Sequence, residues 1–113
     1  MVDARIRMRC GLISAVNLSE VYCKAISVGK RPIIDAIVQT AELQIISFDR
    51  NLASLTASLE ASTRGMGISF ADRVCLALGQ NERLPILTGD HTWAKLDLNV
   101  ELDFFRSKLN LEA

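Results

Sequence analysis

Three carboxylates stand at the ends of apolar segments in this sequence. Glu20 lies at the start of the helical pattern that follows residues 12–16, Asp72 lies in the first turn of residues 69–79, and Asp90 follows residues 84–88 after one glycine. Carboxylates are rarely placed beside a core unless they are paired or bind a cation. Their oxygens are the ligands that Mg²⁺ and Mn²⁺ prefer. The pattern therefore predicts one shared metal site built by three separate segments.

The segments that would position these acids alternate between strand and helix patterns. Strands are expected at residues 12–16, 44–48, 84–88 and 100–104, and helices at residues 17–29, 32–43, 49–63 and 69–79. This alternation predicts an α/β fold with a parallel sheet and right-handed crossovers. In such sheets ligands bind beyond the carboxyl ends of the strands, where helix N-termini also converge. The acids are expected to meet at that edge.

Helix capping is a second explanation for two of the acids. Glu20 follows Asn17 by three residues, and Asp72 follows Ser69 by three, which is the spacing of a capping box. An acid in a first turn stabilises a helix by about 0.3–1 kcal/mol without any further function. Asp90 is also compatible with a simple turn after Thr88 and glycine. Local context alone favours capping for Glu20 and Asp72.

Composition sets the class of protein. The 113 residues are 50% hydrophobic, which is enough for the core of one domain covering residues 1–113. Thirteen basic and thirteen acidic residues cancel, so no overall charge attracts nucleic acid. No apolar run approaches the roughly twenty residues of a membrane span. The three cysteines lack metal-type spacing, and together these features predict a protein of the reducing cytoplasm.

Three motifs in order give the chain a family resemblance. They are ISAVNLSEV at residues 13–21, SFADRVCLAL at 69–78 and PILTGDHTW at 85–93. With these segments the chain resembles a PIN domain of the VapC toxin type over nearly its whole length. The resemblance implies a three-layer α/β sandwich with a mainly parallel sheet and flanking helices. It also implies a magnesium-dependent endoribonuclease that is the toxin of a toxin–antitoxin pair and is usually dimeric.

The resemblance assigns roles to particular residues. Glu20, Asp72 and Asp90 correspond to the second, third and fourth acidic positions of the family, as catalytic residues and ligands of Mg²⁺ or Mn²⁺. Asn17, Arg73 and Thr88 are candidates for orienting those ligands or contacting RNA. Each has an ordinary alternative: Asn17 as a helix cap, Arg73 in an ion pair with a neighbouring acid, and Thr88 as a common strand-end residue.

One family feature is missing from the N-terminal region. The family opens with an apolar strand ending in Asp followed by Thr or Ser, whereas Asp3 is followed by Ala4 and follows no strand pattern. The chain is therefore expected to be an N-terminally short PIN-like domain without the first acidic ligand. Two functions follow. The first is an endoribonuclease toxin with RNA, a cognate antitoxin and a second protomer as partners. The second is an inactive PIN-fold remnant that binds a protein partner.

Overall fold

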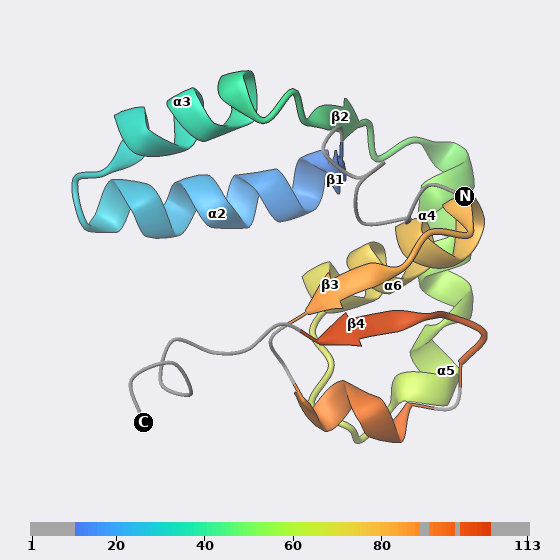
Figure 1. Cartoon of the computed structure of the whole chain (residues 1–113). Coiled ribbons are helices and arrows are strands. Elements are labelled where there is room, and N and C mark those ends of the chain that lie inside the picture. The colour runs from blue at the N-terminus through green and yellow to red at the C-terminus, as the bar shows by residue number, and fades with distance from the viewer. Residues whose placement is uncertain (1–10, 89–90, 97, 105–113) are drawn as a thin grey trace.

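The computed structural model describes residues 11–88, 91–96 and 98–104 (Figure 1). Its elements follow one another in the order β1 (Leu12–Ser14), α2 (Ala15–Ser27), α3 (Arg31–Thr40), β2 (Gln44–Ile46), α4 (Arg50–Ser58), α5 (Glu60–Thr63), α6 (Phe70–Glu82), β3 (Ile86–Thr88), the 3₁₀ helix η2 (His91–Lys95) and β4 (Leu102–Phe104). The predicted alternation of strands and helices is confirmed. Each strand is shorter than its sequence pattern.

The strands form two parallel pairs. β1 pairs with β2, with Leu12 opposite Gln44, and β3 pairs with β4, with Ile86 opposite Leu102. The parallel pairing and the α/β class are confirmed. Within the described residues, however, the strands make two separate two-stranded sheets rather than one continuous sheet.

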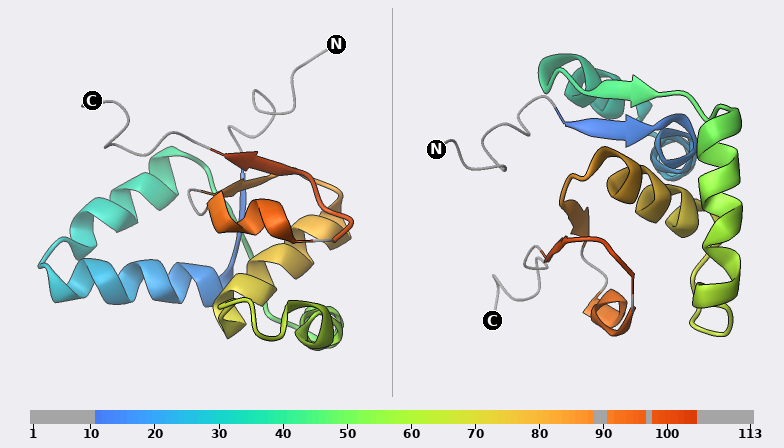
Figure 2. Two further views of the ribbon diagram at one scale, coloured as in Figure 1. Left: turned by 90° about the horizontal axis from the view of Figure 1, so that it is seen from below. Right: turned by 90° about the vertical axis from the view of Figure 1, so that its right-hand side faces the viewer.

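Helix α6 lies between the two strand pairs and contacts both β1 and β3, with α4 packed along it (Figure 2). Its buried side chains include Val74, Leu76 and Ala77, each with no exposed surface. The core cluster around it consists of Leu52, Leu59, Val74, Leu76, Ala77, Leu78, Ile86 and Trp93. An apolar helix buried on several sides is expected to be hydrophobic around most of its circumference, as this one is.

Gly79 lets α6 approach β3 closely. A Cβ atom built at this position would lie 2.2 Å from Cγ1 of Ile86 and 2.5 Å from its Cδ1, well inside van der Waals contact. The core packing between α6 and β3 therefore requires glycine at position 79.

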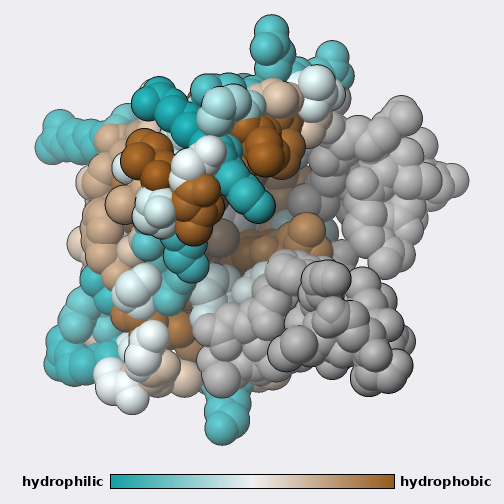
Figure 3. All heavy atoms as spheres, turned by 90° about the vertical axis from the view of Figure 1, so that its left-hand side faces the viewer, coloured by the Kyte–Doolittle hydropathy of each residue, from teal (hydrophilic) through white to brown (hydrophobic). Residues whose placement is uncertain are grey.

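Helices α2 and α3 form a hairpin that extends away from α6 (Figure 1). The phenolic hydroxyl of Tyr22 donates to Asp35, and the guanidinium of Arg31 lies 5.2 Å from the centroid of the Tyr22 ring. α3 contains no buried residue, and its apolar side chains are only partly covered, because Ile33 and Ile37 are about half exposed. Figure 3 faces the hairpin end, where apolar residues lie at the surface among hydrophilic ones.

Within the described residues, no helix is both long enough and apolar enough to cross a bilayer.

Candidate functional site

The start of α2 differs from the sequence prediction. Ser14, not Asn17, is the N-cap: its Oγ accepts the backbone N–H of Asn17 at 3.0 Å and donates to Asn17 Oδ1 at 2.5 Å. β1 ends at Ser14, so the buried serine at the strand end is already in position to cap the helix. The first turn of α2 contains no acid, and Glu20 lies in the next turn. The capping explanation for Glu20 is therefore wrong.

The side chain of Asn17 instead joins two helices. Its Nδ2 donates to the backbone carbonyl oxygen of Ala71 at 2.9 Å, which links α2 to the first turn of α6. Sequence reasoning missed this bond. A partly buried amide needs a hydrogen-bond partner. The position of Asn17 among apolar residues of the predicted helix was therefore the one sequence feature that could have indicated a partner in another segment.

Asp72 has the capping role that its position predicted. Its backbone N–H donates to Ser69 Oγ at 3.1 Å, while its Oδ2 accepts the backbone N–H of Ser69 at 3.1 Å. The two bonds make a complete capping box at the N-terminus of α6. Within the described residues the other carboxylate oxygen of Asp72 has no hydrogen-bond partner, so a half-exposed acceptor remains beside the helix N-terminus.

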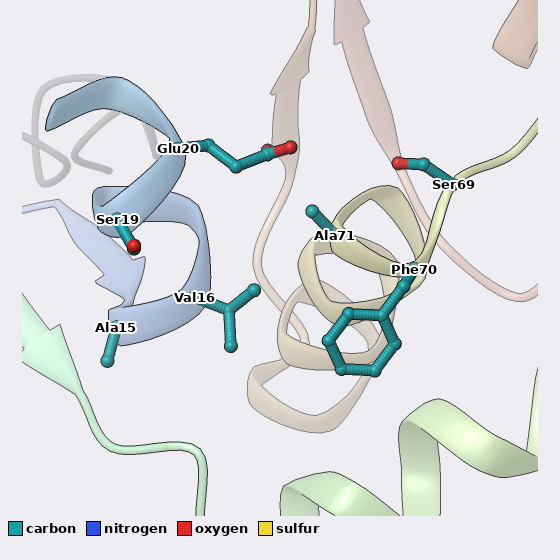
Figure 4. A pocket seen from close by; sticks show the side chains of 7 residues that line it. All are labelled: Ala15, Val16, Ser19, Glu20, Ser69, Phe70 and Ala71. Atoms are coloured by element: carbon teal, nitrogen blue, oxygen red, sulfur yellow. The ribbon is translucent and has the colours of Figure 1, made fainter. Parts of the chain in front are cut away.

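Glu20 and the N-terminus of α6 line one pocket of about 550 Å³. One wall comes from the start of α2 and the other from the start of α6; the lining residues are Ala15, Val16, Ser19, Glu20, Ser69, Phe70 and Ala71. Figure 4 shows the Glu20 carboxylate extending across the pocket toward Ser69, the capping partner of Asp72. Glu20 makes no hydrogen bond or ion pair with any described residue. Its exposed carboxylate is therefore available to a ligand.

The other predicted residues are not among those that line this pocket, or they lie outside the described part. Arg73 donates from Nη1 to the backbone carbonyl oxygen of Ile68 at 3.2 Å, and no described acid forms an ion pair with it. Thr88 is buried at the carboxyl end of β3. Asp90 lies outside the described residues, as do residues 1–10 with Asp3, so the third carboxylate and the N-terminal expectation stay predictions.

The electrostatics near Asp72 affect Cys75, one helical turn further along α6. Burial, and secondly the Asp72 carboxylate, raise the pKa of the Cys75 thiol to about 11. The thiol is therefore protonated at neutral pH and is not a thiolate nucleophile there. The polar side chains that line the described pocket, Ser19, Glu20 and Ser69, carry oxygen atoms as possible ligands.

Carboxylates suit a hard divalent cation. Of the two predicted acids in the described part, Glu20 lines the pocket and Asp72 directly follows the lining residue Ala71. Within residues 11–88, 91–96 and 98–104 no group of three or more His, Cys, Asp or Glu side chains is placed to hold a metal. Any one such site in the described part therefore has at most two of these side chains, and a shared site of Glu20, Asp72 and Asp90 stays a prediction.

In a comparison with known protein families, the PIN domain model matches residues 2–99 of the chain. No curated protein matches the chain.

Proposed function

Because this chain belongs to the PIN-domain family, whose fold is generally that of a nuclease, we propose that it is a metal-dependent endoribonuclease of the VapC toxin type. Its reaction would be hydrolysis of RNA phosphodiester bonds. The observation that carries this proposal is the carboxylate of Glu20, which has no partner in the described structure and faces the capped N-terminus of α6 across a pocket.

The donor set fits Mg²⁺ or Mn²⁺. Glu20 offers both carboxylate oxygens, and Asp72 offers the oxygen that its capping box leaves free. Mg²⁺ is commonly held by one or two carboxylates and keeps several waters, so two acids with an open pocket are an adequate core of a site. Asp90 completes the proposed set as the residue that follows β3 by two positions.

The chain's own residues would position the substrate phosphate. The N-terminus of α6 presents the positive end of the helix dipole to the pocket, which favours a phosphate there. The Asn17–Ala71 hydrogen bond keeps α2 against α6 and thereby the Glu20 carboxylate opposite Ser69. When bound, a divalent cation would lower the pKa of a coordinated water and offset charge on the scissile phosphate. No histidine or serine nucleophile is required.

Cleavage of a mixed RNA pool with and without Mg²⁺ tests the proposal. Glu20→Gln keeps the shape of the side chain but removes its charge, and is expected to lower the cleavage rate on the order of 100-fold or more. The matched control is Glu82→Gln, because Glu82 ends the same helix whose start lines the pocket, and its exposed carboxylate lies outside the pocket. Equal activity of both variants and the wild type, or cleavage that persists with EDTA, would contradict this mechanism.

A second function is favoured by the surface of the α2–α3 hairpin. Ile26, Val28, Ile33 and Ile37 are each about half exposed or more. Exposed apolar side chains gathered on one element often mark a protein–protein contact. On this alternative the chain is an inactive PIN-fold protein that binds an antitoxin or a second copy through the hairpin. Size-exclusion chromatography of Ile33→Lys tests this surface, because the variant should lose self-association. RNA cleavage by the wild type separates the two functions, because the inactive protein would show none.

A further inference from the structure

Phe70 is an aromatic side chain left in solvent at the edge of the pocket. It is the first residue of α6 and is 50% exposed. Among the described large apolar side chains that are exposed, it is the only aromatic one. Full burial of such a ring would stabilise the fold, so leaving it half in water sacrifices part of that stabilisation. The position also places the ring on the same pocket as the Glu20 carboxylate.

A second aromatic ring fixes the orientation of Phe70. Phe48, in the loop after β2, meets it edge-to-face, with the ring centroids 5.7 Å apart and the planes at 79°. Such a contact stabilises the pair of rings beyond the effect of the apolar area that it buries. A ring has two faces, and an edge-to-face contact covers at most one of them. Phe70 is therefore held in place while at least one face stays free of Phe48.

The pocket beside the ring has the polarity that a nucleobase requires. Figure 4 shows Phe70 at one end of the opening, near Val16 and Ala71, with the Glu20 carboxylate at the other end. The hydroxyl of Ser69 also lines the opening. Apolar side chains beside a few polar groups suit a flat heterocycle with a polar edge. The volume of about 550 Å³ is within the range of small-molecule sites.

We propose that Phe70 is a stacking platform for one unpaired base of single-stranded RNA. The inference rests on the ribonuclease function proposed above and adds to that site a residue that would hold one base of the substrate beside the Glu20 carboxylate. Bases in a duplex are stacked on each other and present no free face, whereas single strands are bound by stacking on aromatic side chains. Stacking needs no overall positive charge, which agrees with the chain's formal net charge of +0.

The test is binding of a short labelled single-stranded RNA, measured by fluorescence anisotropy in EDTA, so that no metal-dependent cleavage occurs. Phe70→Leu keeps an apolar side chain but removes the aromatic face, and should raise Kd about 5- to 150-fold, the value of one base–aromatic stack. Phe70→Tyr keeps the face and should bind within about twofold of wild type. Ile33→Leu, on the distant hairpin and similarly exposed, is the matched control and should leave Kd unchanged.

A scan with one abasic nucleotide at each position of the RNA locates the stack. For the wild type, one position should weaken binding by a factor like that of Phe70→Leu, and for Phe70→Leu that position should have no further effect. A thermal unfolding curve shows whether Phe70→Leu folds. If it does not fold, the abasic scan of the wild-type protein alone still tests the stack.

Three results would overturn the inference: no measurable RNA binding by the wild type, an unchanged Kd in Phe70→Leu, or an abasic scan with no sensitive position. A weaker self-association of Phe70→Leu with unchanged RNA affinity would identify the ring as a protein contact instead. Failure of the nuclease proposal is separate, because it appears as absent cleavage or as cleavage unaffected by Glu20→Gln, whatever the binding result.

Discussion

The side-chain amide of Asn17 donates to the backbone carbonyl oxygen of Ala71 at 2.9 Å, across 54 positions of the sequence. Asn17 precedes Glu20 by less than one helical turn, and Ala71 directly precedes Asp72. One hydrogen bond thus links the segments that bear two of the proposed metal ligands. A second bond, from Ser14 Oγ to Asn17 Oδ1, orients the amide so that its nitrogen faces α6.

Removing this amide should affect both stability and the site. Asn17→Ala is expected to lower the free energy of unfolding by about 0.5–1.5 kcal/mol, the net value of a typical hydrogen bond, measured by urea denaturation. If α2 and α6 also lose their alignment, RNA cleavage should fall by more than the stability loss explains. Asn17→Asp is the isosteric comparison: it keeps an acceptor for Ser14 but sets a carboxylate oxygen against the carbonyl oxygen of Ala71, so it should destabilise at least as much as Asn17→Ala. Unfolding at the same urea concentration as wild type would contradict the structural role.

Glu20 and Asp72 should respond differently to loss of charge. Glu20→Gln is expected to change the free energy of unfolding by less than about 0.5 kcal/mol, because Glu20 has no partner in the described structure and no capping role. Asp72→Asn weakens the capping box and the favourable helix-dipole interaction, and should cost about 0.3–1 kcal/mol.

Metal binding should respond to both substitutions. Titration calorimetry with Mn²⁺ is expected to show weaker binding by each variant than by the wild type, since each loses a charged oxygen ligand. Unchanged Mn²⁺ affinity in either variant would exclude that residue as a ligand. Glu82→Gln again serves as the control, with no expected change.

Gly79→Ala should destabilise the core. The added methyl group would lie 2.2 Å from Ile86 Cγ1, so α6 and β3 must separate or Ile86 must change rotamer. Overpacking of this kind costs about 1–3 kcal/mol, visible as a lower midpoint in urea denaturation. Combining it with Ile86→Ala removes the colliding atoms, so the double variant should be more stable than the sum of the two single effects predicts. Strict additivity would show that the two positions do not meet.

The Cys75 thiol should make stability depend on alkaline pH. Its pKa is about 11 in the folded protein, because of burial and then Asp72, against 9.0 for a thiol free of these effects. The folded state keeps the proton, so this contribution is complete below about pH 9 and is lost as pH rises toward 11. The free energy of unfolding should fall by about 2–3 kcal/mol over that window.

Cys75→Ala isolates this effect from other groups that titrate at high pH. The difference in unfolding free energy between wild type and Cys75→Ala should change with pH in the stated window and be constant below it. A constant difference from pH 7 to 11 would contradict a raised thiol pKa. Cys23, which is exposed, provides the internal comparison, since it should react with a thiol reagent at pH 8 much faster than Cys75.

The features that the sequence alone determined are the local ones. Ser69 and Asp72 make their capping box because the two residues are three apart at the start of an apolar helix, and Asp49 caps α4 by accepting the N–H of Leu52 at 2.9 Å. Both depend on contacts within one turn. The order of helices and strands was readable for the same reason, since hydrophobic periodicity is a property of consecutive residues.

The tertiary structure decided what depends on contacts between distant segments. The sequence around Asn17 predicts a helix N-cap, yet Ser14 is the N-cap of α2. The side-chain amide of Asn17 instead donates to the backbone carbonyl oxygen of Ala71, which lies 54 residues further along the chain. That choice moves Glu20 out of the first turn and places its carboxylate across the pocket from α6. Phe70 likewise looks like any apolar first-turn residue until Phe48 is packed against it. Local pattern predicts which elements form, but only the path of the chain determines which side chains share a pocket.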